Sequence, residues 1–220
     1  MSEPGRRATT EFWDDFYAGR TRWSGRPNEL LVAEVQDEPP GDALDLGCGE
    51  GGDAIWLAQQ GWRVTAVDVA AAALAFGAEQ ARRAGVADAI RWVRHDLDET
   101  FPDGSFDLVA SCYLQSPVAL DRAAILRAAA AAVRPGGLVV VVGHAGPPSW
   151  NPDGHGVGMP RAAEVLADLD LGEGWVVERC DDVERSAPDP DGRPGTRPDS
   201  VVRARRAMGH HGSRGPREER

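Results

Sequence analysis

Short apolar runs and helix-period patterns alternate along most of this chain. Apolar runs bounded by glycine or acidic residues are typical of strands in a parallel sheet that is covered on both faces. Seven such runs lie at residues 42–47, 63–69, 90–97, 105–114, 138–144, 174–185 and 200–207. Patterns of helical period occur at residues 51–61, 71–85, 121–137 and 161–170. The first five runs therefore predict strands joined mostly through helices.

This order predicts an α/β fold with a single Rossmann-like, doubly wound sheet of seven strands and helices on both faces. The sheet is expected to be mostly parallel. The last two runs are separated by a turn-forming segment, residues 186–199, and by no helical pattern. They predict a hairpin at the edge of the sheet, with an antiparallel C-terminal strand.

Three regions are expected along the chain. Residues 1–40 form an N-terminal helical cap or lid, with helices at residues 11–20, capped by Thr10, and at residues 29–36. The first ten residues are expected to be irregular. Residues 41–207 form the α/β domain, and residues 208–220 form a disordered tail.

Composition excludes several functions. All 24 basic residues are arginine, so lysine chemistry is impossible, and the net charge of −11 argues against a nucleic-acid surface. The three cysteines, Cys48, Cys112 and Cys180, are widely spaced, which indicates no disulfide framework and no metal site. Without a signal sequence or a membrane-length apolar run, the expected location is the cytoplasm, away from membranes.

Acidic residues surround a glycine turn that otherwise has the spacing of a dinucleotide site. Gly47, Gly49 and Gly52 follow the first strand, with Asp45 before them and Glu50 among them. A carboxylate ~4 Å from a phosphate charge costs about 4 kcal/mol at an effective dielectric constant near 20. The turn therefore favours a cationic nucleoside without phosphate, and S-adenosylmethionine has this chemistry.

The next two strands also end in acidic residues. Asp68 follows the second strand, where a carboxylate can accept hydrogen bonds from both ribose hydroxyls. Asp96 follows the third strand, where it can accept from the adenine amine. Three acids after three consecutive strands indicate a nucleoside site more strongly than the glycines alone.

The segments "LDLGCGEGGDAIWLA", "VTAVDV", "RHDL", "FDLVAS" and "VRPGGLVVVVG" resemble the ordered motifs of class I S-adenosylmethionine-dependent methyltransferases. The N-terminal "FWDDFYAGRTRWSGRPNELLVAEV" resembles the tellurite-resistance and thiopurine methyltransferase-like branch. One departure is Ala70, where the family often has a helix-capping serine. Together with the residue-level reading, the resemblance implies that S-adenosylmethionine is bound, and S-adenosylhomocysteine released, at Arg20, Trp23, Asp45, Gly47, Cys48, Gly49, Asp68, Val69, Asp96, Leu97 and Ser111.

The resemblance also places an acceptor pocket after the fourth strand and beneath the N-terminal helix. His144 and Tyr113 are the candidate catalytic residues there. His144 is expected to act as a polariser or base, or alternatively to satisfy backbone groups at a strand end. Tyr113 is expected to bind the acceptor or to shield the cofactor. Trp23 is expected to cover the sulfonium, and Arg20 to bind the cofactor carboxylate.

The predicted function is in-line methyl transfer to a small-molecule acceptor, by a monomer or homodimer. The acceptor is left open among a thiol, a metalloid, a hydroxyl and an amine. One alternative is an NAD(P)-dependent oxidoreductase, which shares the glycine spacing and the acid at the end of the second strand. Another is a methyltransferase-like module that binds the cofactor without catalysis.

Overall fold

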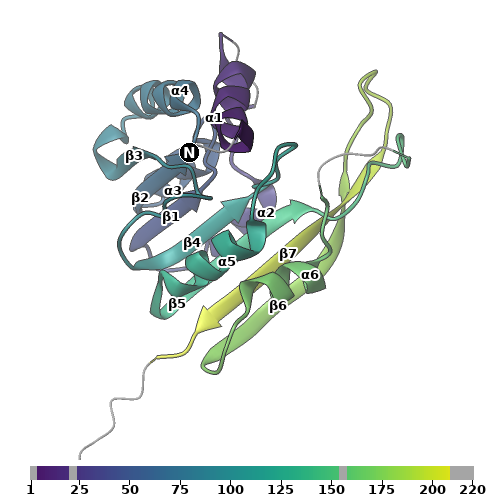
Figure 1. Cartoon of the computed structure of the whole chain (residues 1–220). Helices are drawn as coiled ribbons and strands as arrows, with labels where there is room; N and C mark the ends of the chain where they lie inside the picture. Colours follow the sequence, from purple (N-terminus) through teal and green to yellow (C-terminus); the bar gives the residue numbers. More distant parts are fainter. Residues whose placement is uncertain (1–3, 20–23, 154–157, 209–220) are drawn as a thin grey trace, which may run out of the picture.

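A computed structural model describes residues 4–19, 24–153 and 158–208 (Figure 1). Its strands are β1 (Asp42–Leu46), β2 (Arg63–Asp68), β3 (Ile90–Arg94), β4 (Phe106–Cys112), β5 (Val133–His144), β6 (Trp175–Ser186) and β7 (Thr196–Arg206). Its helices are α1 (Pro4–Tyr17), α2 (Glu29–Val35), α3 (Gly52–Gln59), α4 (Ala71–Arg83), the short 3-10 helix η1 (Ala87–Ala89), α5 (Arg122–Ala131) and α6 (Ala162–Leu169).

The seven strands form one sheet in the order β3-β2-β1-β4-β5-β7-β6. β7 runs antiparallel to both of its neighbours, and every other pair is parallel. This confirms the predicted mostly parallel sheet with an antiparallel C-terminal strand. Strand order reverses between β1 and β4, and ligands of open α/β sheets bind at such a switch point.

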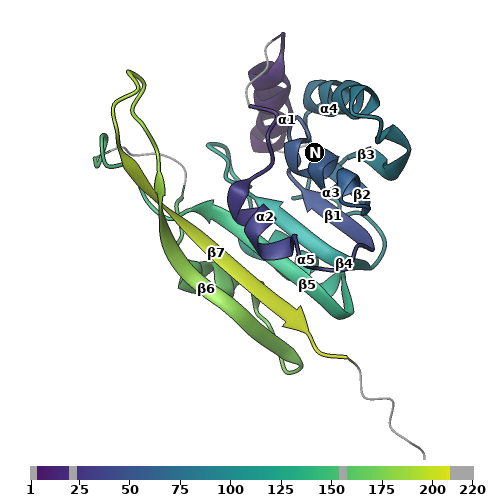
Figure 2. The same ribbon diagram turned by 180° about the vertical axis from the view of Figure 1, so that it is seen from behind.

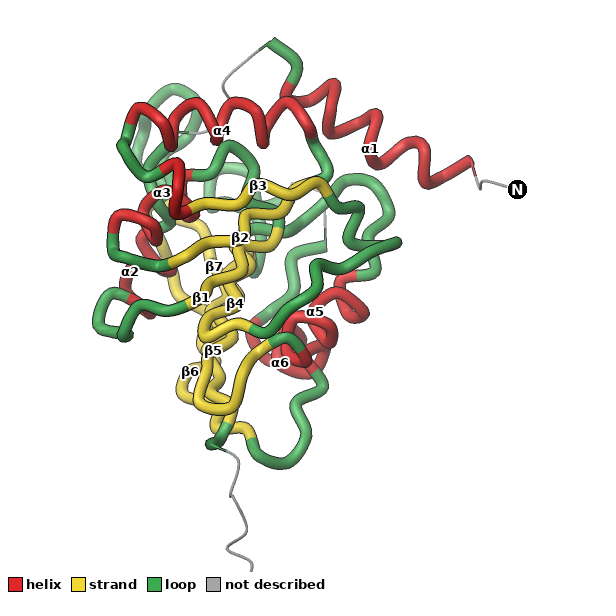
Figure 3. The backbone as a smooth tube through the Cα atoms, turned by 90° about the vertical axis from the view of Figure 1, so that its left-hand side faces the viewer, coloured by secondary structure: helices red, strands yellow, loops and turns green. Residues whose placement is uncertain are grey.

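Helices cover both faces of the sheet. Figure 3 shows α2 and α3 on one side of the strands and α5 and α6 on the other. Leu31 and Leu57 pack on the first face, and Leu126 and Val165 on the second. Each fully buried side chain of this size contributes about 1.5–3 kcal/mol. No helix in the described ranges has the length and apolar character needed to cross a bilayer.

Two predicted boundaries were wrong. Helix α1 begins at Pro4, so Thr10 lies inside the helix and does not cap it. Proline fits the first helical position because its missing N–H has no partner there in any case. Helix α5 ends at Ala131 and β5 begins at Val133, before the expected stop at residues 135–137. The strand accommodates Pro135 where its register with β4 shifts.

Asp14 of α1 supplies the helix cap that Ala70 lacks. The backbone N–H of Ala71, the first residue of α4, donates to Asp14 Oδ1 at 2.9 Å. Asp14 also forms an ion pair with Arg94 at 2.8 Å. The ring of Tyr17 packs beside Ala70 and Ala73. These contacts fix α1 against α4, above the carboxyl ends of the strands.

Helix α2 is tied to the β6–β7 hairpin. Glu38, just after α2, accepts from Arg203 at 2.5 Å and from Arg205 at 2.7 Å. Glu34 pairs with Arg179 of β6. Figure 2 shows α2 on the face of the sheet near β7. We call these five residues the ion-pair ladder, because it joins the N-terminal region to the last strands.

Candidate cofactor and acceptor site

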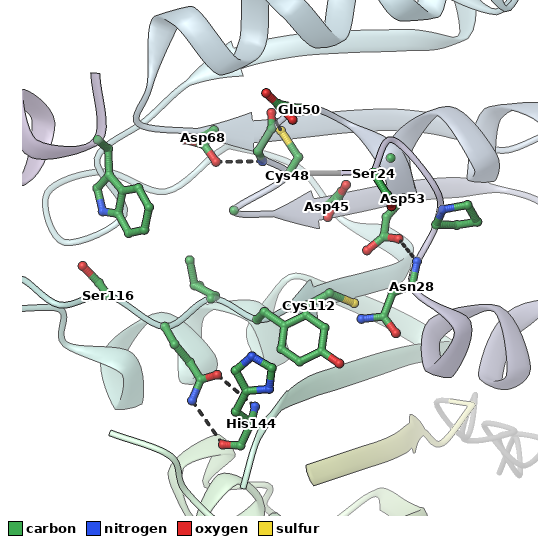
Figure 4. Close-up of a pocket in the computed structure, with 18 of the residues that line it drawn as sticks. Ser24, Asn28, Asp45, Cys48, Glu50, Asp53, Asp68, Cys112, Ser116 and His144 are labelled. Carbon is green, nitrogen blue, oxygen red and sulfur yellow. Dashed lines mark hydrogen bonds between the residues drawn. The ribbon is translucent and has the colours of Figure 1, made fainter. Parts of the chain in front are cut away.

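A cavity of about 1110 Å³ opens at the carboxyl ends of the central strands (Figure 4). Its walls come from α1, from the loop before α2, from the loops after β1, β2, β3, β4 and β5, and from the β6–β7 hairpin. Pockets for one drug-sized ligand span roughly 300–1,000 Å³. The cavity therefore has room for two ligands side by side.

The glycine turn shapes one end of this cavity. Gly47 and Gly49 have φ angles of +69° and +52°, which residues with a Cβ rarely adopt. The Gly49 N–H donates to Asp68 Oδ2 at 2.8 Å, and the Cys48 N–H donates to the Val67 carbonyl at 2.9 Å. The turn is therefore held against the end of β2, with its backbone exposed to a ligand.

Three carboxylates, Asp45, Asp53 and Asp68, lie together beside the turn, and we call them the acidic crevice. Burial raises the pKa of each one, and the charges of Asp53 and Asp68 raise the pKa of Asp45 further. Asp53 accepts from the Asn28 N–H at 2.6 Å, and Asp68 accepts from Gly49 and Ala70. Like charges in a low dielectric favour a bound cation here.

Two buried side-chain atoms that line this end have no hydrogen-bond partner among the described residues: Asp45 Oδ2 and Asn28 Nδ2. One is an acceptor and the other a donor. Orphaned buried polar atoms cost about 1–3 kcal/mol each, so a ligand that satisfies both gains affinity. The ammonium and carboxylate of an amino-acid group have the required chemistry.

Most of the residues predicted to bind the cofactor meet at this cavity. It is lined by Asp45, Gly47, Cys48, Gly49, Asp68, Val69, Asp96 and Leu97. Ser111 does not line it; the residue is buried in β4, and the next residue, Cys112, reaches the cavity instead. Successive strand residues point to opposite faces, which accounts for the difference. Arg20 and Trp23 lie outside the described residues.

The aromatic residues of α1 contribute to both packing and the cavity wall. Trp13, Phe16 and Tyr17 line the cavity, while Phe12 is exposed. The Trp13 and Tyr17 ring centroids lie 6.1 Å apart. Helix α1 therefore contributes aromatic rings to the wall of the cavity.

The two cysteines near the crevice are held as thiols. Burial raises the pKa of Cys48 and of Cys112, and the charges of nearby aspartates raise both pKa values further. A thiolate is the reactive form of cysteine, so neither residue is suited to act as a nucleophile.

Across the cavity, a second group of polar residues surrounds Asp199, whose side chain is fully buried in β7. The carboxylate accepts from Tyr113 Oη at 2.7 Å and from Arg185 Nε at 2.5 Å, and His144 Nδ1 lies 2.8 Å from its Oδ1. Burial raises the pKa of Asp199, but hydrogen bonds from His144, Arg185 and Tyr113 outweigh it and leave the pKa below its ordinary value. We call these four residues the Asp199 network.

The ionised Asp199 sets the tautomer of His144. An acceptor-only carboxylate requires the proton on Nδ1, which leaves a lone pair on Nε2. Gln115 fixes the strand end by accepting from the His144 N–H at 2.9 Å and donating to its carbonyl at 3.2 Å. In Figure 4, His144 points into the cavity from the side opposite Asp68. The imidazole is therefore built to accept a proton.

Tyr113 supports this arrangement. Its hydroxyl proton is committed to Asp199, and its ring centroid lies 4.4 Å from that of His144. Burial, followed by the hydrogen bond to Asp199, raises the pKa of Tyr113. Its backbone has a φ of +53°, a strained value for a tyrosine. The contacts of Tyr113 are therefore suited to positioning Asp199 and His144, and its hydroxyl is not suited to act as a base.

A methyltransferase domain profile matches residues 43–137 of the chain. The chain is 31% identical over 170 residues to a 2-heptyl-1-hydroxyquinolin-4(1H)-one methyltransferase from Mycobacteroides abscessus, covering 73% of this chain and 71% of that protein. It is 32% identical over 148 residues to a ubiquinone biosynthesis O-methyltransferase from Methylobacterium, covering 60% and 57%. The chain thus spans little more than half of the second relative.

Solved structures agree on the fold. TehB from Haemophilus influenzae superposes with a TM-score of 0.68 at 17% identity, over 88% of this chain and 66% of that one. An S-adenosylmethionine-dependent methyltransferase from Mesorhizobium loti gives a TM-score of 0.59 at 24% identity, over 80% and 96%. Fold, site and relatives define a Rossmann-like methyltransferase. The chain belongs to the class I S-adenosylmethionine-dependent methyltransferases, and S-adenosylmethionine is its cofactor.

Several site residues were missed from the sequence. Asn28 and Asp53 lie within segments that carry the family resemblance, and Asp53 is one of the acids near the glycine turn, but neither was given a role in binding. Arg185 and Asp199 flank a turn-rich segment in the sequence, and only the pairing of β6, β7 and β5 brings them to His144. The one available signal was the hairpin predicted after the last parallel strand, because its residues lie beside the strand that ends at His144.

Proposed function

We propose that this protein methylates a hydroxyl group of a small molecule, with His144 as the general base. The observation that carries the proposal is the Nδ1 contact of His144 with the buried carboxylate of Asp199, 2.8 Å away. This contact holds the imidazole in the tautomer that can take a proton. A soft thiol or metalloid anion needs no such base, whereas a hydroxyl does.

The acidic crevice would hold the cofactor. Asp68 would accept from the ribose hydroxyls, and Asp96 from the adenine amine. Asp45 would bind the ammonium, and the free amide N–H of Asn28 would bind the carboxylate. When bound, S-adenosylmethionine supplies an electrophilic methyl group on a sulfonium. The crevice carboxylates complement the charge of this group and exclude pyrophosphate.

His144 would act on the acceptor. The acceptor hydroxyl gives its proton to Nε2 of His144 as the new O–CH₃ bond forms and the S–CH₃ bond breaks, with the electron pair remaining on sulfur. Asp199 then stabilises the imidazolium, and the ion pair with Arg185 keeps Asp199 ionised. In-line alignment by the cavity walls supplies the remaining catalysis, about 7–11 kcal/mol for well-oriented groups.

The names of the relatives support an oxygen acceptor. One acts on a hydroxyquinolinone, and the other is an O-methyltransferase. The similarity to TehB is a similarity of fold, and it supports the tellurite-resistance branch only loosely. We therefore place a hydroxyl above a metalloid as the acceptor.

The test compares His144→Gln with the wild type, using a phenol and the matching aryl thiol as acceptors and mass spectrometry to follow the products. General-base catalysis contributes about 10²–10⁴-fold. We expect kcat/KM for the phenol to fall within that range, while the aryl thiol, already ionised in mildly alkaline buffer, loses less than tenfold.

His95→Gln is the matched control, because His95 contacts Thr100 and does not line the cavity. It should leave both reactions unchanged. Equal losses for the phenol and the thiol in His144→Gln would assign His144 a structural part. No methylated product from any acceptor, with S-adenosylhomocysteine still bound, would favour a non-catalytic module.

A further inference from the structure

Two arginines of the hairpin face the acceptor side of the cavity. Arg185 and Arg197 are directly opposite each other in the β6–β7 register, and both line the cavity. Cross-strand partners project to the same face of a sheet, where like charges destabilise the pairing. The repulsion between the two guanidinium groups therefore needs to be offset by a negatively charged partner or by a bound ligand.

Among the described residues, Arg185 forms an ion pair with a carboxylate and Arg197 does not. Asp199 lies two residues beyond Arg197 on the same strand, and it pairs with Arg185 at 2.5 Å. Arg197 donates from Nε to the Gly146 carbonyl at 3.1 Å, and one of its terminal nitrogens lies 3.7 Å from Met159 Sδ. Neutral acceptors of this kind leave the guanidinium charge uncompensated.

The other surroundings of Arg197 also leave its positive charge poorly compensated. Arg197 is partly buried. Burial lowers its pKa, an effect that the charge of Asp199 opposes and that of Arg185 adds to. An arginine without its own carboxylate in a ligand cavity is available to bind an anionic group of a ligand.

The position of Arg197 favours the acceptor over the cofactor. β7 is separated from β1 by β4 and β5, so three strand spacings, about 14 Å, lie between it and the strand of Asp45. His144 is directly opposite Asp199, and Arg197 precedes Asp199 by two residues on β7, about 7 Å at the backbone. Arg197 and His144 both line the cavity, so one small aromatic acceptor can contact both.

Resting on the proposed function, we propose that the methyl acceptor is a hydroxylated aromatic acid, whose anionic oxygen group binds Arg197 while its hydroxyl faces His144. The cavity side chains suit the ring, because Tyr113 lies beside His144 and Met159 lies beside Arg197, and both line the cavity. The cavity thus offers carboxylates beside the glycine turn to a cationic cofactor, and the guanidinium of Arg197 on the hairpin to an anionic acceptor.

The experiment uses matched probes that differ only in charge: 4-hydroxyphenylacetate against 4-hydroxyphenylacetamide, and 4-hydroxybenzoate against 4-hydroxybenzamide. Binding to the protein saturated with S-adenosylhomocysteine is measured by calorimetry, and methylation by product analysis. A charge-assisted hydrogen bond is worth roughly tenfold to a hundredfold. The wild type should prefer the acids by that factor, and Arg197→Gln should abolish the preference.

Arg193→Gln is the matched control, since Arg193 lies on the turn of the same hairpin and is exposed. It should retain the preference, and Arg197→Lys should retain part of it. Equal binding of acids and amides by the wild type, or an unchanged preference in Arg197→Gln, overturns the inference. Weaker binding of S-adenosylhomocysteine in Arg197→Gln also overturns it, because Arg197 would then serve the cofactor.

These outcomes are separable from failure of the proposed function. His144→Gln should reduce methylation of acids and amides by the same factor and leave the binding preference for acids intact. Acid-selective binding without product would reject O-methylation and retain the anion site. Methylation of amides as fast as acids would retain O-methylation and reject the anion site.

Discussion

The two ends of the cavity treat buried carboxylates in opposite ways. In the acidic crevice, three aspartates are buried close together; burial raises all three pKa values, and the charges of Asp53 and Asp68 raise that of Asp45 further. In the Asp199 network, a single fully buried aspartate has three side-chain partners, and its pKa lies below the ordinary value. Burial opposes ionisation in both places, so the kind of partner decides the outcome: Asp68 accepts from neutral backbone N–H groups, whereas the partners of Asp199 include the cationic Arg185.

This difference distinguishes the acidic crevice, which is a ligand-binding site, from the Asp199 network, which holds other residues in place. A buried carboxylate without a cationic partner, such as Asp45, stores unfavourable energy that a cationic ligand can relieve. A carboxylate that is already paired with a cation, such as Asp199, holds neighbouring groups in place. The crevice is thus incomplete without its ligand, while the network is complete and preorganised.

The largest effect is expected from Asp199→Asn, which preserves volume and removes the charge. An amide can donate to Nδ1 of His144 and so leave the proton on Nε2, the nitrogen needed as base. We expect kcat/KM for a hydroxyl acceptor to fall about 10²–10⁴-fold with S-adenosylhomocysteine affinity unchanged. Steady-state kinetics and calorimetry measure the two quantities, and an equal loss in both would place Asp199 in the cofactor site.

The lowered pKa of Asp199 also predicts a stability profile. A carboxyl with a depressed folded pKa stabilises the fold above its unfolded pKa, about 3.9, and loses that contribution as pH falls through the folded pKa. Wild type should therefore lose stability below about pH 4 more steeply than Asp199→Asn. Denaturant unfolding across this range measures the slopes, and parallel slopes would contradict the ionised state.

The next effect is on cofactor affinity. Asp68→Ala removes the carboxylate that accepts from Gly49 and Ala70 and that we expect to accept from the ribose. We expect S-adenosylhomocysteine to bind at least about 20-fold more weakly, because charge-assisted hydrogen bonds are worth about 1.5–3 kcal/mol. The exposed Asp88 gives the control Asp88→Ala. Unchanged affinity in the Asp68 variant would contradict its assignment.

Sequence reasoning reached the acidic crevice because the crevice is local. Asp45, Gly47 and Gly49 lie within five consecutive residues, and Asp68 ends the next strand. Parallel strands bring their carboxyl ends to one edge, so the order of elements alone places these residues together. The seven-stranded sheet followed from the same alternation of apolar runs and helical periods.

The Asp199 network was beyond that reasoning because it depends on register. His144 meets Asp199 only because β7 pairs antiparallel with β5 in one register, and a shift of one residue would turn Asp199 to the other face. The hairpin was predicted, but its register was not. Asp14 was missed as the cap of α4 for the same reason, since 57 residues separate donor and acceptor.

A smaller effect is expected from Asp45→Asn, which should raise the stability of the ligand-free protein and weaken cofactor binding. The raised pKa means that ionised Asp45 destabilises the ligand-free fold above its unfolded pKa, so the variant should be more stable at neutral pH and not below about pH 4. It should also bind S-adenosylhomocysteine about tenfold more weakly. Thermal unfolding and calorimetry measure the pair. A variant that loses both stability and affinity would show that Asp45 is satisfied without ligand.

The smallest effect tests the ion-pair ladder, which joins α2 and Glu38 to the β6–β7 hairpin. Glu38 accepts from Arg203 and Arg205, and its removal leaves two half-buried arginines with one carboxylate, Glu178, between them. Because the side chains are partly exposed, we expect Glu38→Gln to cost only about 1 kcal/mol, or about 2–4 °C in Tm. The exposed helix pairs of Glu79 give the control Glu79→Gln, which should cost less. Since Asn28 caps the start of α2, loosening the helix should also weaken S-adenosylhomocysteine binding by a few-fold while leaving the acid preference of the acceptor side intact. A loss of that preference with cofactor affinity unchanged would show that the ladder supports the hairpin and not the crevice.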